Sequence, residues 1–354
     1  MLRRLMERFT LTDAFMWLVG GSIVTLVVVG SYATLSQGAY TARHWFDFLV
    51  FGLAQGSVYA LIALGYTLVY GILRMINFAH SEVFMSGAYI GFFVITAMSG
   101  SGFLDENPLV ALLAVFLVAM ITSVTIAVLL ERIAYRPLRR SPRLVPLITA
   151  IGASFFLQEA FRTIFGSASK GYPDVDALKG TWTLSGEFII QKLQVLVIVA
   201  GALMMFFLYM FVMRTKTGKA MRAVSEDKDV AALMGIDVDA IIVRTFVVGA
   251  ALAGAAGVLY SLMFRQINAY IGFIPGIKAF TAAVLGGIGN IPGAMLGGLF
   301  LGIFESVGPI LFLDGLGVAA PYQLKDVIAF TMLVLVLIFR PTGILGERLA
   351  TAKA

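Results

Sequence analysis

Long apolar runs separated by short polar segments follow one another along most of the chain. A membrane-spanning helix needs about 20 mainly apolar residues, and most of the runs reach that length. The pattern predicts an all-α, polytopic integral membrane protein with about ten transmembrane segments. The runs are Phe15–Leu35, Phe46–Leu73, Phe78–Met98, Leu109–Leu130, Leu144–Phe165, Leu193–Met213, Ile241–Met263, Ile277–Gly289, Gly293–Leu313 and Leu324–Ile338.

One run, Ile277–Gly289, is too short to cross about 30 Å of hydrocarbon as a simple helix. It is expected to be a half-helix, or part of a longer tilted helix that starts near Tyr270. The first run follows three arginines and so also fits a secretory signal, but its length favours a retained helix.

Basic residues in the polar segments predict the orientation. If the ten runs alternate in direction, one face receives Arg3, Arg4, Arg8, Arg132, Arg136, Arg139, Arg140, Arg143, Arg214, Lys216, Lys219, Arg222, Lys228, Arg340, Arg348 and Lys353. Lysine and arginine are retained in the cytoplasm, so both termini are expected there. Residues 99–107 and 166–188 are expected to face outward.

The chain is expected to divide by its relation to the membrane. The parts are an extra N-terminal helix with a basic start (1–45), a first permease part (46–213), a cytoplasmic segment (214–240), a second permease part (241–340) and a cytoplasmic tail (341–354).

Composition supports a lipid environment: 60% of residues are hydrophobic, 13% are charged, and the mean hydropathy is +0.94. Soluble domains are about half apolar and about a quarter charged. The net charge of +6 does not indicate nucleic-acid binding, because the basic residues form no single patch. The chain has no cysteine, and the pattern indicates no metal site, catalytic residue or cofactor.

The glycine-rich stretch "GGIGNIPGAMLGG" (Gly286–Gly298) resembles a phosphate loop at first sight. It lacks the Lys-Ser/Thr that a nucleotide-binding loop requires. Small residues four positions apart instead let membrane helices approach closely. Three glycines with this spacing are expected to serve helix packing: Gly289, Gly293 and Gly297.

The cytoplasmic segment is expected to contain one helix of about ten residues, capped by Ser225 and ended by Gly235. Two acids, Glu226 and Asp227, are expected in its first turn, where the helix dipole favours negative charge. Its apolar face consists of Val230, Leu233 and Met234. A free helix of this length is marginal in water, so the segment is either a docking element for an external partner or a connecting loop.

Three stretches make the chain resemble the permease subunits of ATP-binding-cassette (ABC) importers for branched-chain amino acids. They are "LGYTLVYGILRMINFAHSEVFMSGAY" (Leu64–Tyr89), "RAVSEDKDVAALMGI" (Arg222–Ile236) and "NAYIGFIPGIKAFTAAVLGGIGNIPGAMLGG" (Asn268–Gly298). The resemblance extends from about residue 46 onward. Two departures are Ser81, where the family usually has glycine, and the additional residues 1–45.

The resemblance implies an ABC importer permease fold in a bacterial inner membrane. It implies four kinds of partner: a second, related permease, two cytoplasmic ATPases, a periplasmic binding protein and the amino-acid substrate. It also makes the helix from Ser225 to Gly235 the coupling helix that docks in an ATPase, whereas the chain itself is not an enzyme.

Polar groups inside the apolar runs are candidates for the translocation pathway or its gate, because stranding a charge in lipid costs about 3 kcal/mol. They are Asn77, His80, Glu82, Lys278 and Glu305. Asn77 also fits the N-cap of the third helix, with His80 and Glu82 in its first turns. Glu82 could instead pair with Arg74.

Two other functions stay open. The chain could be a secondary transporter that uses Glu82 or Glu305 as an ion or proton site, although the cytoplasmic helix would then have no role. Within the ABC importers, the cargo could be urea, a short amide or another amino acid.

Overall fold

The computed structural model describes residues 11–139, 141–142, 144–340 and 342–346. Several of the basic residues on which the orientation prediction relies lie outside these ranges: Arg3, Arg4, Arg8, Arg140, Arg143, Arg348 and Lys353. The ends of the predicted parts 1–45 and 341–354 lie outside them too.

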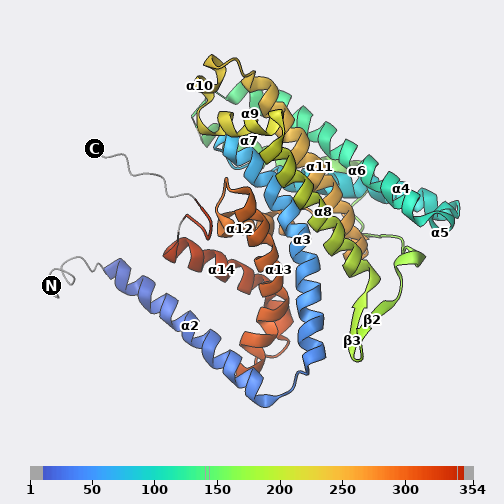
Figure 1. Ribbon diagram of the computed structural model, residues 1–354, viewed down its shortest axis with the longest axis vertical. Helices are drawn as coiled ribbons and strands as arrows, with labels where there is room; N and C mark the ends of the chain where they lie inside the picture. Colours follow the sequence, from blue (N-terminus) through green and yellow to red (C-terminus); the bar gives the residue numbers. More distant parts are fainter. Residues whose placement is uncertain (1–10, 140, 143, 341, 347–354) are drawn as a thin grey trace.

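Helices make up nearly all of the described chain (Figure 1). The longer ones are α2 (Leu11–Gln37), α3 (Ala42–Leu73), α4 (His80–Gly100), α6 (Pro108–Leu130), α7 (Leu144–Phe165), α8 (Lys192–Arg214), α11 (Val238–Phe264), α12 (Phe273–Gly286), α13 (Ile291–Leu313) and α14 (Lys325–Phe339). In the described residues, nine helical stretches are long and apolar enough to cross a membrane, and α12 is shorter. Helices suit a bilayer because they satisfy their backbone hydrogen bonds internally.

Short elements connect the long helices. They are α5 (Phe103–Glu106), the π-helix η1 (Glu131–Tyr135), the 3-10 helices η2 (Arg136–Leu138), η3 (Asp176–Leu178), η4 (Asp314–Leu316) and η5 (Pro321–Leu324), and the helices α9 (Lys216–Glu226) and α10 (Lys228–Leu233). The strands are β1 (Lys170–Gly171), β2 (Thr181–Ser185), β3 (Phe188–Gln191) and β4 (Gln266–Ile267). β2 and β3 form an antiparallel hairpin, and β1 pairs antiparallel with β4.

Helix α3 occupies the centre of the bundle and contacts α8, α11, α12 and α13. α11 adds contacts with α4 and α6. α2 and α14 lie at the periphery, where few of their side chains are buried (Figure 1). The extra N-terminal helix is therefore an attachment to the bundle, anchored mainly along α13 and η4.

The close contact between α3 and α13 depends on glycines. A Cβ atom added to Gly298 would lie 2.4 Å from the backbone of Ala60, and one added to Gly302 would lie 2.3 Å from the backbone of Gly56. No side chain could fit at either position. The small-residue rule for membrane helices applies here, although the sequence reading had assigned it to other glycines.

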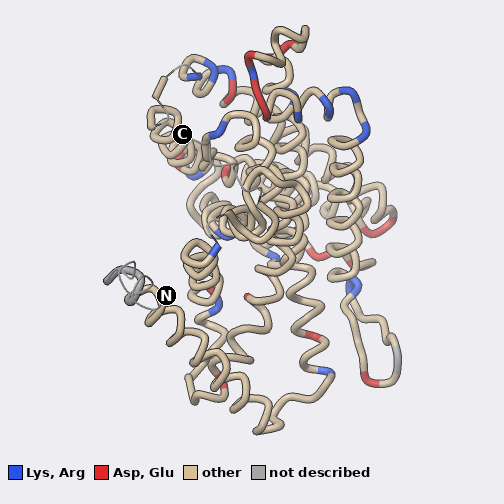
Figure 2. The backbone as a smooth tube through the Cα atoms, turned by 60° about the vertical axis from the view of Figure 1, so that its left-hand side comes forward, with Lys and Arg blue, Asp and Glu red and all other residues tan. Residues whose placement is uncertain are grey.

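The two ends of the bundle differ in charge. α9 and α10 lie at one end, with the start of α7, and the β2–β3 hairpin lies toward the other (Figure 1). Lysine and arginine residues gather at the end with α9 and α10 (Figure 2). The described residues at this end include Arg74, Arg136, Arg139, Arg214, Lys216, Lys219, Arg222 and Lys228.

Candidate functional site

The segment expected to hold one coupling helix forms two helices. Ser225 lies in the last turn of α9, where its hydroxyl donates to the carbonyl of Arg222, so the prediction that it caps a helix is wrong. Asp227 is the cap: its carboxylate accepts hydrogen bonds from the backbone N–H groups of Asp229 and Val230, at 2.8 and 2.9 Å. Serine and aspartate are comparable N-caps by residue type, but Ser225 lies inside α9, whereas Asp227 directly precedes α10 and its charge also favours the helix dipole.

Helix α10 is shorter than expected, with six residues. Glu226 ends α9 and does not lie in the first turn of α10. Gly235 has a positive φ of 82°, which suits glycine and ends the helix as predicted.

The predicted apolar face of α10 is present and uncovered. Leu233 is 86% exposed, Met234 78% and Val230 55%, whereas Ala231 packs inward. Large apolar side chains gathered at the surface usually mark an interaction site. Here they lie at the end of the bundle that holds the basic residues.

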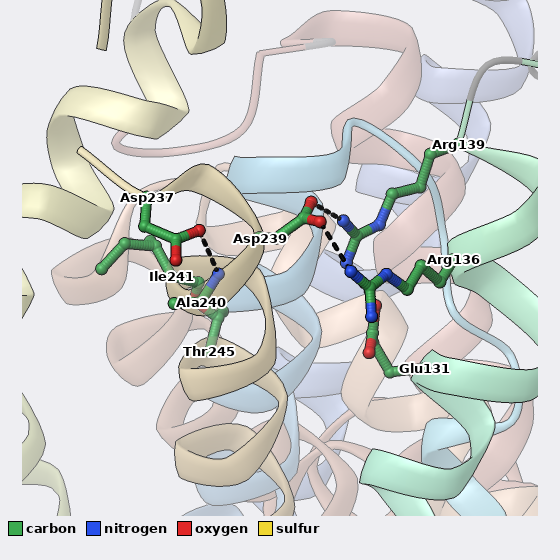
Figure 3. Close-up of polar contacts among 8 residues, drawn as sticks. All are labelled: Glu131, Arg136, Arg139, Asp237, Asp239, Ala240, Ile241 and Thr245. Carbon is green, nitrogen blue, oxygen red and sulfur yellow. Dashed lines mark hydrogen bonds and ion pairs between the residues drawn. The ribbon is translucent and has the colours of Figure 1, made fainter. Parts of the chain in front are cut away.

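Hydrogen bonds and ion pairs join the polar connections at this end of the bundle. Arg74 donates to the carbonyl of Ser225 at 2.9 Å. Arg136 and Arg139, which follow the π-helix, both pair with Asp239 in the first turn of α11 (Figure 3). Arg139 also pairs with the buried carboxylate of Glu131. Arg74 therefore links α9 to the end of α3, and Arg136 and Arg139 link the loop after the π-helix to the start of α11.

A cavity of about 280 Å³ lies beside the start of α10, and its lining includes Arg74, Arg139 and Lys228. Burial, followed by the charges of Arg139 and Arg74, lowers the pKa of Lys228.

The start of α4 differs from the expected capped helix. Asn77 does not cap α4, whose N-cap is Ala79 without a side-chain bond. The Asn77 side chain instead accepts a 2.6 Å hydrogen bond from the hydroxyl of the buried Tyr135. This bond ties the turn before α4 to the π-helix, and burial of the amide leaves no freedom for it to turn toward the helix start.

His80 and Glu82 lie in the first turn of α4, as expected, and both are buried. The Nε2 atom of His80 has no hydrogen-bond partner among the described residues. Arg74 does not pair with Glu82, because its guanidinium is held by Ser225. The proposed Glu82–Arg74 ion pair is therefore wrong.

Neutral donors surround Glu82. Its Oε1 atom accepts from Ser81 at 3.1 Å, Ser154 at 3.2 Å and Gln158 at 2.8 Å. Its Oε2 atom has no partner among the described residues. A fully buried carboxylate that meets only neutral groups is costly, which makes Glu82 a strong candidate for a functional role.

Lys278 and Glu305, predicted separately, lie together. Lys278 Nζ is 2.6 Å from Glu305 Oε1 and 2.5 Å from Asp326 Oδ1. Gln55 donates to Glu305 Oε1 at 2.8 Å and to Tyr59 at 2.6 Å. This cluster joins the half-helix α12 to α3, α13 and α14.

Two of the three glycines expected to pack helices do so. Gly293 and Gly297 lie against the backbone of α12, where an added Cβ would meet carbonyl oxygens at 2.4 and 2.1 Å. Gly289 does not: it lies in the turn before α13 with a φ of 98° and open space around it. There the chain needs glycine for its left-handed backbone.

The sequence reading missed the partners of its candidates. Gln55, Tyr135, Ser154, Gln158 and Asp326 each bond to a predicted residue. An amide within an apolar run, such as Gln55 or Gln158, could have been found as a polar group that needs a partner in lipid.

Comparison with known proteins identifies the chain. Residues 48–337 match the family described as "Branched-chain amino acid transport system / permease component". The chain belongs to this family. The match agrees with the predicted start of the resemblance near residue 46 and with a polytopic all-α membrane protein. It makes the chain a transport subunit, and it favours a multi-component transport system over an ion-coupled secondary transporter.

The chain covers nearly the full length of two relatives that are named as branched-chain amino acid permeases. The chain is 50% identical over 307 residues to the high-affinity branched-chain amino acid transport system permease protein BraD of Pseudomonas aeruginosa, covering 86% of this chain and 96% of BraD. It is 46% identical over 300 residues to LivH of Escherichia coli K12, covering 84% and 94%. A probable branched-chain amino acid permease named LivM, from Methanocaldococcus jannaschii, is 29% identical over 152 residues, or 40% of this chain and 44% of LivM.

Proposed function

We propose that this permease forms the translocation pathway for branched-chain amino acids in an ATP-driven importer. The observation that carries the proposal is the 50% identity, over 96% of its length, to a protein named for high-affinity transport of that cargo. The partners would be a related second permease, two cytoplasmic ATPases and a periplasmic binding protein. Similarity to a protein named LivM supports the related second permease.

Coupling would occur at α10. An ATPase needs a contact through which to move the membrane helices, and α10 offers Val230, Leu233 and Met234 as an uncovered apolar face. Helix α9 would carry the motion to α3 through the Arg74 contact, and α10 leads directly into α11. Asn77, His80 and Glu82 would form part of the pathway or its gate, together with the Lys278–Glu305 pair.

Reconstitution tests the cargo. The permease, assembled with its ATPases and its second permease, would be placed in proteoliposomes with its binding protein. We expect ATP-dependent uptake of leucine, isoleucine and valine, and little uptake of urea or short amides. Equal uptake of urea would refute the assignment of branched-chain amino acids as the cargo. Uptake without the ATPase subunits would refute the ABC mechanism.

Orientation in an inner membrane is proposed from the basic residues at the α9–α10 end. The chain has no native cysteine, so single cysteines report sidedness. In intact cells with a permeable outer membrane, an impermeant thiol reagent should label Glu187→Cys in the hairpin but not Pro137→Cys. The reverse pattern would invert the proposed topology.

A further inference from the structure

A cavity of about 270 Å³ opens beside the β2–β3 hairpin, at the opposite end of the bundle from α10. Its walls come from the segment around η3, the ends of the hairpin, the first turn of α8 and the last turn of α11. Pockets for drug-sized ligands usually measure about 300 to 1,000 Å³. A ligand for this cavity must therefore be small.

Arg265 and Asp174 place opposite charges on one wall of the cavity, and some of their hydrogen-bonding atoms have no partner among the described residues. Arg265 Nε lies 3.2 Å from Asp174 Oδ1. The two terminal guanidinium nitrogens of Arg265 have no hydrogen-bond or ion-pair partner in the described part of the chain, and Asp174 Oδ2 has only Lys179 Nζ, at 3.8 Å. Lys179 itself is held by Asp176 at 2.6 Å. The wall thus offers a guanidinium edge and a carboxylate oxygen side by side.

Branched aliphatic side chains supply the other surfaces. Val175 and Leu262 line the cavity and are themselves buried, at 4% and 5% exposed. Leu178 and Leu193 also line it and pack against the same core. Because these residues are fixed by packing, the apolar surface is in place before any ligand arrives.

We propose that this cavity binds a free α-amino acid with a branched aliphatic side chain. The terminal nitrogens of Arg265 would hold its carboxylate in a two-bond fork, Asp174 Oδ2 would accept from its ammonium group, and the leucine and valine wall would take the side chain. The inference rests on the proposed function and deepens it, since the permease itself would select the cargo on the side facing the binding protein. Urea and short amides carry no pair of charges to match this wall.

Direct binding to the assembled permease complex in lipid nanodiscs, without the binding protein, tests the inference. The probes are radiolabelled leucine, 4-methylpentanoate, which lacks the ammonium group, and 3-methylbutylamine, which lacks the carboxylate. Leucine should bind saturably, and each of the other two should bind about 10-fold more weakly or worse, because a hydrogen bond to a charged group contributes about 1.5 to 3 kcal/mol.

Two variants test which residue binds which charged group of the amino acid. Asp174→Asn should weaken leucine by about 10-fold and leave 4-methylpentanoate unchanged. Arg265→Gln should weaken leucine similarly and leave 3-methylbutylamine unchanged. If Arg265 served only the ion pair with Asp174, Arg265→Lys would bind leucine as well as the wild type does. If its terminal nitrogens form the two-bond fork, Arg265→Lys binds leucine more weakly. The matched control is Arg162→Lys, since Arg162 forms a comparable 2.7 Å pair with Glu159 and does not line this cavity.

Outcomes separate the inference from the proposed function. A preparation that imports leucine with its binding protein but binds none on its own would overturn the inference and leave the function intact. Loss of binding in the Arg162→Lys control, or equal loss of all three probes in Asp174→Asn, would also overturn it. Failure of leucine import in the complete system would instead refute the proposed function.

Discussion

Removing the ammonium group of Lys278 would leave a carboxylate stranded inside the bundle. Lys278 is 3% exposed in its side chain and Glu305 is fully buried, with 2.6 Å between Nζ and Oε1. Lys278→Met keeps the apolar stem and removes the charge. The same change at Lys179, which also lies 2.6 Å from an acid but on an exposed surface, is the matched control.

The magnitude follows from the distances. With an effective dielectric constant of about 20, opposite charges attract by about 6 kcal/mol at 2.6 Å and about 4 kcal/mol at 3.9 Å. Lys325 already lies 3.9 Å from Glu305, so closing to 2.6 Å after the substitution would regain only about 2 of the roughly 6 kcal/mol lost, for a net loss of about 4 kcal/mol. Breaking a buried pair without such help costs about 3 to 5 kcal/mol. We therefore expect Lys278→Met to lower the free energy of unfolding by about 3 to 5 kcal/mol.

A double variant separates the stranded charge from lost packing. Lys278→Met with Glu305→Gln removes both charges, and Gln55 can still donate to the new amide oxygen. We expect it to recover most of the stability that Lys278→Met loses, because replacing both members of a buried pair is often nearly neutral. Asp326, the other partner of Lys278, is 45% exposed and can be solvated instead.

Equilibrium unfolding in mixed detergent and SDS micelles, followed by tryptophan fluorescence, measures these differences. Lys179→Met should unfold like the wild type, because exposed pairs contribute little. Equal losses in Lys278→Met and Lys179→Met would refute the claim that burial sets the cost. A double variant as unstable as Lys278→Met would refute the stranded charge as its cause.

Four further predictions concern transport and packing. Leu233→Asp should abolish co-purification of the ATPases and uptake, because an unpaired charge in a buried contact costs several kcal/mol, whereas the similarly exposed hairpin change Leu184→Asp should affect neither. Glu82→Gln should lower leucine uptake in proteoliposomes with subunit assembly intact, and wild-type uptake would remove this residue from the gate. Asn77→Ala, which loses the bond to the π-helix, should slow uptake without preventing assembly. Gly297→Leu should prevent stable expression, measured by fluorescence-detected size exclusion, because its Cβ would lie 2.1 Å from a carbonyl oxygen of α12.

Local sequence determined the number and approximate positions of the long membrane helices, and the short length of α12. Apolar runs of about 20 residues must form helices in lipid, because no other single segment satisfies its own backbone there. The run from Ile277 to Gly289 was expected to be a half-helix, and α12 is one, from Phe273 to Gly286. The apolar face of α10 and its end at Gly235 were also predicted, since periodicity and turn chemistry act over a few neighbouring residues.

Capping and pairing were decided by the tertiary structure. Ser225 and Asn77 are both good caps by residue type, but Asp227 lies closer to the actual helix start, and Tyr135 competes for the Asn77 amide across 58 positions of sequence. Likewise, Glu305 meets Lys278 and Gln55 only because three helices pass one another at that depth. Sequence thus indicated which polar groups need a partner in the membrane. Which partner each one has depends on helix packing, which brings distant residues within bonding distance.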